Sequence, residues 1–438
     1  MSVFNRESDA GIGRGERAIL VLPDRDGQGS ARSQDARLDE AAGLAEAIGI
    51  NVVGRRAFRI RQPRPATLFG KGQVEEIAGQ VETEEAGLLV VDASLTPVQQ
   101  KSLEDGTKAK VIDRTGLILE IFGERAATAE GRLQVELAHL DYQAGRLVRS
   151  WTHLERQRGG FGFLGGPGET QIEADRRLIR DRMAKIRREL EQVKRTRSLH
   201  RDRRQRAPWP VIALVGYTNA GKSTLFNRLT QAHVFAENLL FATLDPTMRD
   251  VRLPGFDKAI LSDTVGFVSN LPTELIAAFR ATLEEVASAD LIVHVRDISH
   301  PDTDAQKSDV EDVLASLGLD EPDSPPRLEA WNKLDLLDGD ERAAVLAEAA
   351  RRDDVVPLSA LGGEGTDALR ERIAERLREG AEIHEIQLPV SDGERIAWLH
   401  ARGEVLDSDV DEHVMRLRVR LSPENWTRFQ AGQKLAAE

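Results

Sequence analysis

The stretch PVIALVGYTNAGKSTLFNRLT, residues 210–230, decides the fold of the central part of the chain. VIALV is an apolar run of strand length, and TLFNRL is helical with its apolar residues on one face. Between them, GYTNAGKS (216–223) fits the pattern G-x-x-x-x-G-K-[ST]. A strand, a glycine loop and a helix in this order predict a phosphate-binding loop in a parallel α/β domain.

The residue types of this loop suit a nucleotide. Gly216 and Gly221 let the backbone wrap closely around phosphates and point its N–H groups inward. We expect Lys222 to reach the β- and γ-phosphates and Ser223 to ligate Mg²⁺, while the helix N-terminus adds partial positive charge. A plain glycine turn is the alternative, and the strand–loop–helix context disfavours it. The predicted phosphate contacts are Gly216, Tyr217, Thr218, Asn219, Ala220, Gly221, Lys222 and Ser223.

A second motif follows downstream. AILSDTVGF (259–267) predicts a strand that ends in DTVG. Asp263 at the end of a strand can hold Mg²⁺ through water, and the Gly266 amide can meet the γ-phosphate. A lone D-x-x-G is usually only a turn, but its position after the phosphate loop favours the functional interpretation. The predicted contacts here are Asp263, Thr264, Val265 and Gly266.

A third motif indicates guanine. LEAWNKLD (328–335) ends in N-K-x-D, and a carboxylate at Asp335 can accept from both N1–H and N2–H₂ of guanine, a donor pair that adenine lacks. Asn332 is expected to brace the loop, and the stem of Lys333 to cover the ring. In VVPLSAL (355–361) the backbone after the strand can reach guanine O6. The predicted base contacts are Asn332, Lys333, Leu334, Asp335, Ser359, Ala360 and Leu361.

The segment LFATLDPT (240–247) lies between the first two motifs. A GTPase needs a threonine here to sense the γ-phosphate through Mg²⁺, and Thr243 and Thr247 both qualify. The residue after DTVG is Phe267, where many small GTPases have a Gln that orients the attacking water. A phenyl ring cannot do so. We therefore expect slow intrinsic hydrolysis that a partner completes, or another residue in this role.

Composition bounds the architecture. The chain has 438 residues, 40% hydrophobic and 30% charged, which is typical of a soluble protein with two or three domains. Cysteine is absent, so disulfides and thiolate metal sites are excluded. Without a signal sequence or an apolar run near the roughly 20 residues of a membrane span, we expect a cytoplasmic protein. Alternating strands and helices predict an N-terminal parallel α/β domain (17–127), then a helical hairpin (128–207), a G domain (208–378) and a small C-terminal α/β appendage (379–438).

The hairpin carries a basic arm. Residues 176–206 hold fourteen Lys/Arg and four Asp/Glu, a net charge of +10 on a chain whose total is −13. RGGFGFLGGPGE (158–169), with six glycines and one proline, predicts a loop between two long helices. Arginines beside Phe161 and Phe163 favour RNA binding through phosphate contacts and base stacking. A solvated helix face and a flexible linker are the alternatives.

Together these residues resemble the HflX family of ribosome-associated GTPases. PATLFGKGQVEEI (65–77), the segment 111–142 and GGPGETQIEADRRLIRDR (165–182) look like the family's N-terminal signatures, and the resemblance covers residues 17–430. It implies GTP hydrolysis and binding of the large ribosomal subunit near the peptidyl-transferase centre, with splitting or rescue of stalled ribosomes. It also selects Thr243 as the Mg²⁺ ligand and implies contacts from F-A-T-L-D, namely Phe241, Ala242, Thr243, Leu244 and Asp245. A hydrophobic residue at Phe267 is common in the family, whereas the lack of a basic residue just before G-P-G-E is a departure.

The sequence therefore predicts a Mg²⁺-dependent GTPase that converts GTP to GDP and phosphate, with Lys222, Thr243 and Gly266 as catalytic residues and Ser223 and Thr243 as metal ligands. We expect a monomer that binds the large subunit and its rRNA through the hairpin and the glycine loop. A non-ribosomal RNA-binding regulator with GTP as a low-turnover switch is the alternative. The N-K-L-D motif disfavours an ATP-dependent enzyme.

Overall fold

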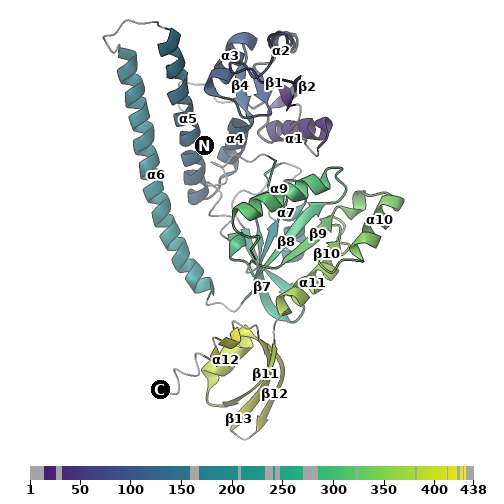
Figure 1. The fold of residues 1–438 in the computed structure, drawn as a ribbon. Helices are drawn as coiled ribbons and strands as arrows, with labels where there is room; N and C mark the ends of the chain where they lie inside the picture. The colour runs from purple at the N-terminus through teal and green to yellow at the C-terminus, as the bar shows by residue number, and fades with distance from the viewer. Residues whose placement is uncertain are drawn as a thin grey trace.

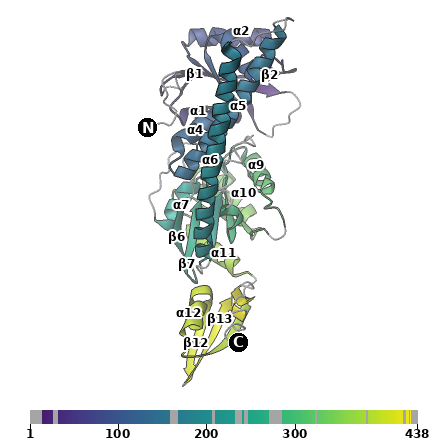
Figure 2. The ribbon, with the colours of Figure 1, turned by 90° about the vertical axis from the view of Figure 1, so that its left-hand side faces the viewer.

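The computed structural model contains three separate β-sheets along an elongated chain (Figure 1). A long helical hairpin lies beside the first two sheets, and the third sheet lies at the C-terminal end (Figures 1 and 2). The fold is mixed α/β, as predicted. The structure describes residues 14–25, 32–157, 167–205, 209–231, 240–241, 247–269, 285–321, 324–379, 382–411, 413–421, 425–427 and 429–430.

The N-terminal unit, residues 17–125, is built on a parallel four-stranded sheet of order β2-β1-β3-β4. Its strands are β1 (Arg17–Arg25), β2 (Asn51–Ile60), β3 (Leu88–Val91) and β4 (Lys110–Asp113). Its helices are α1 (Gln34–Glu46), α2 (Lys71–Thr83), α3 (Pro97–Thr107) and α4 (Arg114–Arg125). The apolar stretches RAILVLP (17–23) and GLLVVDA (87–93) predict buried strands. The structure confirms both as β1 and β3, whose apolar residues lie in the core.

Two features of this unit differ from the expectation. The strand β2 is not predicted from the sequence, because NVVGRRAFRI contains no long apolar run. Most of its residues are exposed or half-buried. The stretch KVIDRT (110–115) predicts a strand, but β4 ends two residues earlier, at Asp113. Asp113 caps the following helix by accepting from the Gly116 amide at 2.8 Å, so Arg114 begins α4 rather than extending β4.

The hairpin consists of α5 (Ala129–Gln157) and α6 (Pro167–Gln205), which pack side by side (Figure 1). Arg182 on α6 holds Glu136 on α5 with two bonds of 2.7 and 2.8 Å. The glycine-rich stretch 158–169 predicts that the second helix begins at Thr170, which is wrong. α6 begins at Pro167, because proline is favoured in a first helical turn. Phe161 and Phe163 lie outside the described residues. In the described part of the chain, no helix combines the length and apolarity needed to cross a membrane.

The G domain, residues 211–378, has a six-stranded sheet of order β10-β9-β8-β5-β7-β6, in which only β6 runs antiparallel to its neighbour. Its strands are β5 (Val211–Val215), β6 (Thr247–Leu253), β7 (Phe256–Asp263), β8 (Leu291–Asp297), β9 (Arg327–Asn332) and β10 (Val355–Pro357). Its helices are α7 (Lys222–Thr230), α9 (Thr303–Ser316), α10 (Gly339–Ala349) and α11 (Thr366–Arg378).

The C-terminal unit is an antiparallel sheet of order β11-β13-β12 packed on α12 and on the helical residues 425–427 and 429–430. It contains β11 (Glu382–Pro389), α12 (Gly393–Arg402), β12 (Glu404–Asp411) and β13 (Val414–Leu421). The stretch GERIAWLHARGEV (393–405) predicts a helix, but α12 ends at Arg402 and β12 begins at Glu404. The numerical domain boundaries given above stay predictions.

The N-terminal unit and the G domain share one hydrophobic core. Leu117, Ile118 and Phe122 of α4 belong to the same cluster as Phe241 and Phe267 of the G domain. Burial of large apolar side chains across such a boundary is the main source of its stability. The N-terminal unit therefore packs directly against the part of the G domain that carries the nucleotide motifs.

Candidate nucleotide site

The loop between β5 and α7 has the backbone that close phosphate contact requires. Gly216 has φ +151°, and a Cβ there would lie 2.2 Å from the carbonyl oxygen of Val295 on β8. Gly221 has φ +94°, and its Cβ would lie 2.2 Å from the Asn332 amide nitrogen. Both positions exclude a side chain, so the two glycines of the motif are required by packing as well as by conformation.

Lys222 and Ser223 open α7 beneath this loop. The Lys222 ammonium donates to the carbonyl oxygens of Gly216 at 3.0 Å and Tyr217 at 2.8 Å. Burial lowers the pKa of Lys222 to about 8, and nearby Asp263 opposes this shift. A buried ammonium at the mouth of the loop is placed to bind an anion.

Asp263, the last residue of β7, reaches the same point. The Ser223 hydroxyl donates to its carboxylate at 2.7 Å. The Thr218 hydroxyl is buried and has no hydrogen-bond partner among the residues that the structure describes. A hydroxyl, a carboxylate and an unsatisfied loop hydroxyl suit phosphate with Mg²⁺, because magnesium prefers oxygen ligands.

The DTVGF segment lies against the phosphate loop. The Thr218 amide donates to the Phe267 carbonyl at 2.7 Å, and the Phe267 amide donates to the Gly216 carbonyl at 3.1 Å. A Cβ at Gly266 would lie 2.9 Å from the Cα of Thr218 and 3.1 Å from the Lys222 nitrogen, and the backbone contact leaves room only for glycine. The ring of Phe267 is 2% exposed and belongs to the core shared with the N-terminal unit. Phe267 is thus a packing residue and cannot orient water.

Asn332 joins the predicted base loop to the phosphate loop. Its amide donates to the Ala220 carbonyl at 2.8 Å, and its side-chain oxygen accepts from the Ala360 amide at 2.8 Å. Lys333, with φ +70°, donates to Asp297 at 2.6 Å. Asp335 is exposed beside them. One side chain therefore fixes the spacing of the two loops that the sequence assigns to phosphate and base.

Part of the predicted set lies outside the described residues, namely Ala242, Thr243, Leu244 and Asp245. Thr247, the other candidate threonine, begins β6 and lies opposite Asp263 on β7. Tyr217, Asn219, Thr264, Val265 and Leu334 lie in the loops just described, Ser359 and Ala360 are buried after β10, and Leu361 is 74% exposed. The individual roles of these residues stay predictions.

Four sequence families match successive parts of the chain. These are the N-terminal region of GTP-binding GTPases (35–123), their middle region (125–204), the 50S ribosome-binding GTPase domain (211–333) and the HflX C-terminal domain (344–432). The chain is 50% identical to GTPase HflX of Magnetococcus marinus over 90% of both chains. It is 40% identical to GTPase HflX of Escherichia coli over 95% of this chain and 96% of that one.

The chain belongs to the HflX family of GTPases. Among solved structures, it is similar to a GTP-binding protein from Sulfolobus solfataricus in complex with GDP, with a TM-score of 0.44 and 23% identity over 83% of this chain and 99% of that chain. The identity of the family and the geometry of the loop agree that the chain is a GTPase.

Sequence reasoning misses the residues of this HflX GTPase that reach its G domain from elsewhere. Glu40 on α1 accepts a hydrogen bond from the Tyr217 hydroxyl, and Arg114 at the start of α4 contacts Ser269 just beyond DTVGF. These partners lie about 155 to 177 positions apart in the sequence. No local pattern marks them, since a charged residue on a helix is usually a solvated one.

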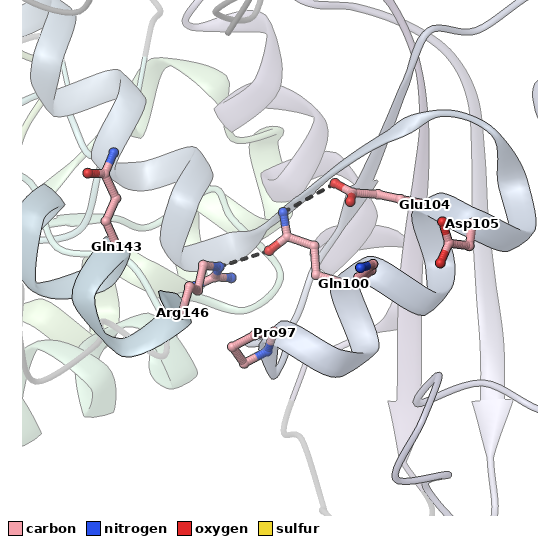
Figure 3. Close-up of a pocket in the computed structure, with 7 residues that line it drawn as sticks. Pro97, Gln100, Glu104, Asp105, Gln143 and Arg146 are labelled. Carbon is pink, nitrogen blue, oxygen red and sulfur yellow. Dashed lines mark hydrogen bonds between the residues drawn. The ribbon is translucent and has the colours of Figure 1, made fainter. Parts of the chain in front are cut away.

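The HflX N-terminal unit also has an open hollow between α3 and α5, with a volume of about 540 Å³ (Figure 3). Arg146 donates to Gln100 at 2.8 Å along its wall, and Gln100 contacts Glu104. The remaining lining residues are Pro97, Lys101, Asp105 and Gln143. The hollow thus has a wall of mixed charge, and it includes none of the predicted nucleotide contacts.

Proposed function

We propose that this GTPase binds the large ribosomal subunit near the peptidyl-transferase centre and uses GTP to split or rescue stalled ribosomes. The observation that carries the proposal is the match of residues 211–333 to the 50S ribosome-binding GTPase domain. GTPases HflX from several bacteria, 40–50% identical to this chain, support it. We further propose that the protein is cytoplasmic and monomeric.

The exposed arginines of α6 support contact with rRNA. Arg177, Arg180, Arg187 and Arg188 are exposed on the helix, while Arg182 is held by α5. Each phosphate that an arginine neutralises releases condensed counterions, so binding through such a row falls with salt. We propose that this face and the glycine loop at its end form the ribosome-binding surface.

The nucleotide chemistry follows from the loop geometry. We propose that GTP lies on residues 216–223, with Lys222 beside its phosphates and Asp335 reading guanine. Ser223 and Asp263 have the oxygen donors that fit Mg²⁺, and we propose Ser223 and Thr243 as its direct ligands. The metal supplies charge neutralisation at the phosphates. Lys222 and the Gly266 amide stabilise the charge that develops on the γ-phosphate oxygens.

The test is GTP turnover with and without purified large subunits, together with co-sedimentation of protein and subunits at two salt concentrations. We expect the subunits to stimulate turnover and the binding to weaken steeply with salt. Arg187→Glu with Arg188→Glu should lower the affinity for subunits and reduce the salt dependence. The control variant, Arg351→Glu with Arg372→Glu on the G domain, makes the same change of charge and should bind like wild type.

Two results decide against the proposal. Equal turnover with and without large subunits favours the alternative, an RNA-binding regulator with GTP as a low-turnover switch. If binding does not depend on salt and is unaffected by charge reversal at Arg187 and Arg188, the exposed face of α6 is a solvated helix face without a role in ribosome binding.

Shortening the loop between α5 and α6 should leave GTP binding intact but abolish subunit splitting.

A further inference from the structure

The N-terminal unit contacts three nucleotide-site segments of the G domain, although no motif predicts this. Its helices α1 and α4 lie next to the G domain (Figure 1). They touch the phosphate loop at Tyr217, the segment after DTVGF at Ser269, and Leu240 and Phe241 at the start of the predicted threonine segment. The first of these segments holds the phosphates of the nucleotide in a GTPase, and the other two respond to the γ-phosphate and Mg²⁺.

Glu40 is the centre of the polar part of this contact. Its side chain is 11% exposed and accepts hydrogen bonds from Arg32 at 2.8 Å, Arg114 at 2.5 Å and the Ser269 hydroxyl at 3.0 Å, as well as from the Tyr217 hydroxyl. Burial opposes its ionisation, but Arg114, Tyr217 and Arg32 outweigh burial and lower the pKa of Glu40. The carboxylate therefore stays charged within the interface.

Ser269 is held by both sides of the same cluster. Its amide donates to the Tyr217 hydroxyl at 2.7 Å. Arg114 donates to the Ser269 carbonyl at 3.0 Å and contacts the Ser269 hydroxyl at 2.9 Å, and its other nitrogen pairs with Asp92. The position of Ser269 relative to the phosphate loop is thus set by side chains of the N-terminal unit.

The third segment is held by apolar contacts. The ring of Phe241, at φ +58°, packs edge-on against Phe122 of α4 with the centroids 4.7 Å apart and an interplanar angle of 84°. A Cβ at Gly43 of α1 would lie 3.3 Å from the Leu240 side chain. Phe241 is two residues before the threonine predicted to bind Mg²⁺, so its anchoring limits where that threonine can go.

We propose that Glu40 and Arg114 of the N-terminal unit are positioning residues for GTP hydrolysis, which act through Tyr217 and Ser269 on the spacing between the phosphate loop and the Gly266 segment. The Tyr217 hydroxyl bonds Glu40 and Arg32 of the N-terminal unit, and it also accepts from the Ser269 amide of the G domain. Because Gly266 is three residues before Ser269 and approaches Lys222 closely, displacement of Ser269 moves the backbone that is placed to meet the γ-phosphate.

A purely structural role is the alternative for this cluster. Buried ion networks often add little net stability, although loss of one partner is costly. A structural role predicts lower stability with unchanged turnover by the folded protein. A positioning role predicts a loss in the rate of the chemical step with little change in nucleotide binding, because the contact aligns groups that matter in the transition state.

The experiment compares Glu40→Gln, Tyr217→Phe and the double variant in the full chain. Both single changes keep the shape of the side chain. We expect each to lower kcat about tenfold, the loss typical of a removed buried hydrogen bond to a charged group, while KM for GTP changes less than about threefold. The double variant should lose less than the product of the two single losses, because both changes weaken the Glu40–Tyr217 contact.

The matched control is Glu46→Gln on the same helix, where the carboxylate makes an exposed ion pair with Arg55. It should keep the wild-type kcat. Thermal unfolding with saturating GDP identifies the variants that fold. If Glu40→Gln does not fold, Ser269→Ala takes its place, since it removes only the contacts of the Ser269 hydroxyl. A wild-type kcat in the folded variants, or losses that multiply in the double variant, overturns the proposal.

Discussion

Asn332→Ala is expected to weaken both the fold of the G domain and its hold on nucleotide. The Asn332 side chain is 2% exposed and satisfies the Ala220 carbonyl and the Ala360 amide, both buried. Removal leaves two buried polar groups without a partner, at about 2 kcal/mol each, or about 4 kcal/mol in all. If a water molecule hydrogen-bonds one of these groups, a loss of about 2 kcal/mol remains. If this loss destabilises only the GTP-bound state, it equals about a thirtyfold loss of GTP affinity.

The measurement is titration of the variant with a fluorescent GTP analogue, together with urea unfolding. Asn425→Ala is the control, since the Asn425 amide donates to the Arg402 carbonyl at 3.1 Å in the C-terminal unit, away from the nucleotide motifs. The control should bind nucleotide like wild type. An Asn332→Ala protein that binds GTP within threefold of wild type would refute the claim that this side chain couples the two loops.

Three more predictions follow from single residues. Asp335→Asn should shift preference from GTP to XTP, because xanthine has a carbonyl where guanine has N2–H₂; competition of the two nucleotides measures it, and unchanged preference for GTP contradicts the base-reading role. Phe267→Ala should lower the free energy of unfolding by about 3–5 kcal/mol and Phe267→Leu by less than about 1.5 kcal/mol, while partner-stimulated turnover by folded protein persists; urea unfolding and turnover assays test this. Burial lowers the pKa of His294 to about 3. Below about pH 6.5 the unfolded chain therefore takes up a proton at this residue that the folded protein does not. The free energy of unfolding should fall as the pH drops from 6.5 towards 3, by about 2 kcal/mol between pH 7 and 5. A His294→Gln protein whose stability falls just as much over that range would disprove it.

The strands and loops of the G domain were predictable where local pattern and function coincide. VIALV is followed by two positions that require glycine, Gly216 and Gly221, and the structure places β5, the loop and α7 in that order. β8 escaped prediction although its seven residues are all buried, because LIVHVRD carries a histidine and an arginine that interrupt its apolar run. Arg296 is satisfied there by Glu329 at 2.8 Å, a partner from β9 that sequence alone does not reveal.

The contact between the units could not be predicted for a related reason. Glu40 lies on a helix whose sequence, QDARLDEAAGLAE, has acidic residues at four positions. Nothing local distinguishes the one that faces Tyr217 from those that face water. Long-range polar partners become visible only when the fold brings the chain together, whereas motifs that bind one ligand keep their residues close in sequence.

The length of α6 has a mechanical consequence. Its 39 residues span about 58 Å at 1.5 Å per residue, and it runs from the glycine-loop end of the hairpin back towards the strand that precedes the phosphate loop (Figure 1). A rigid rod of this length that pivots by about 5° at its G-domain end displaces its far end by about 5 Å. A small rotation that leaves the two units in contact would therefore move the loop end of α6 by about the width of a nucleotide base.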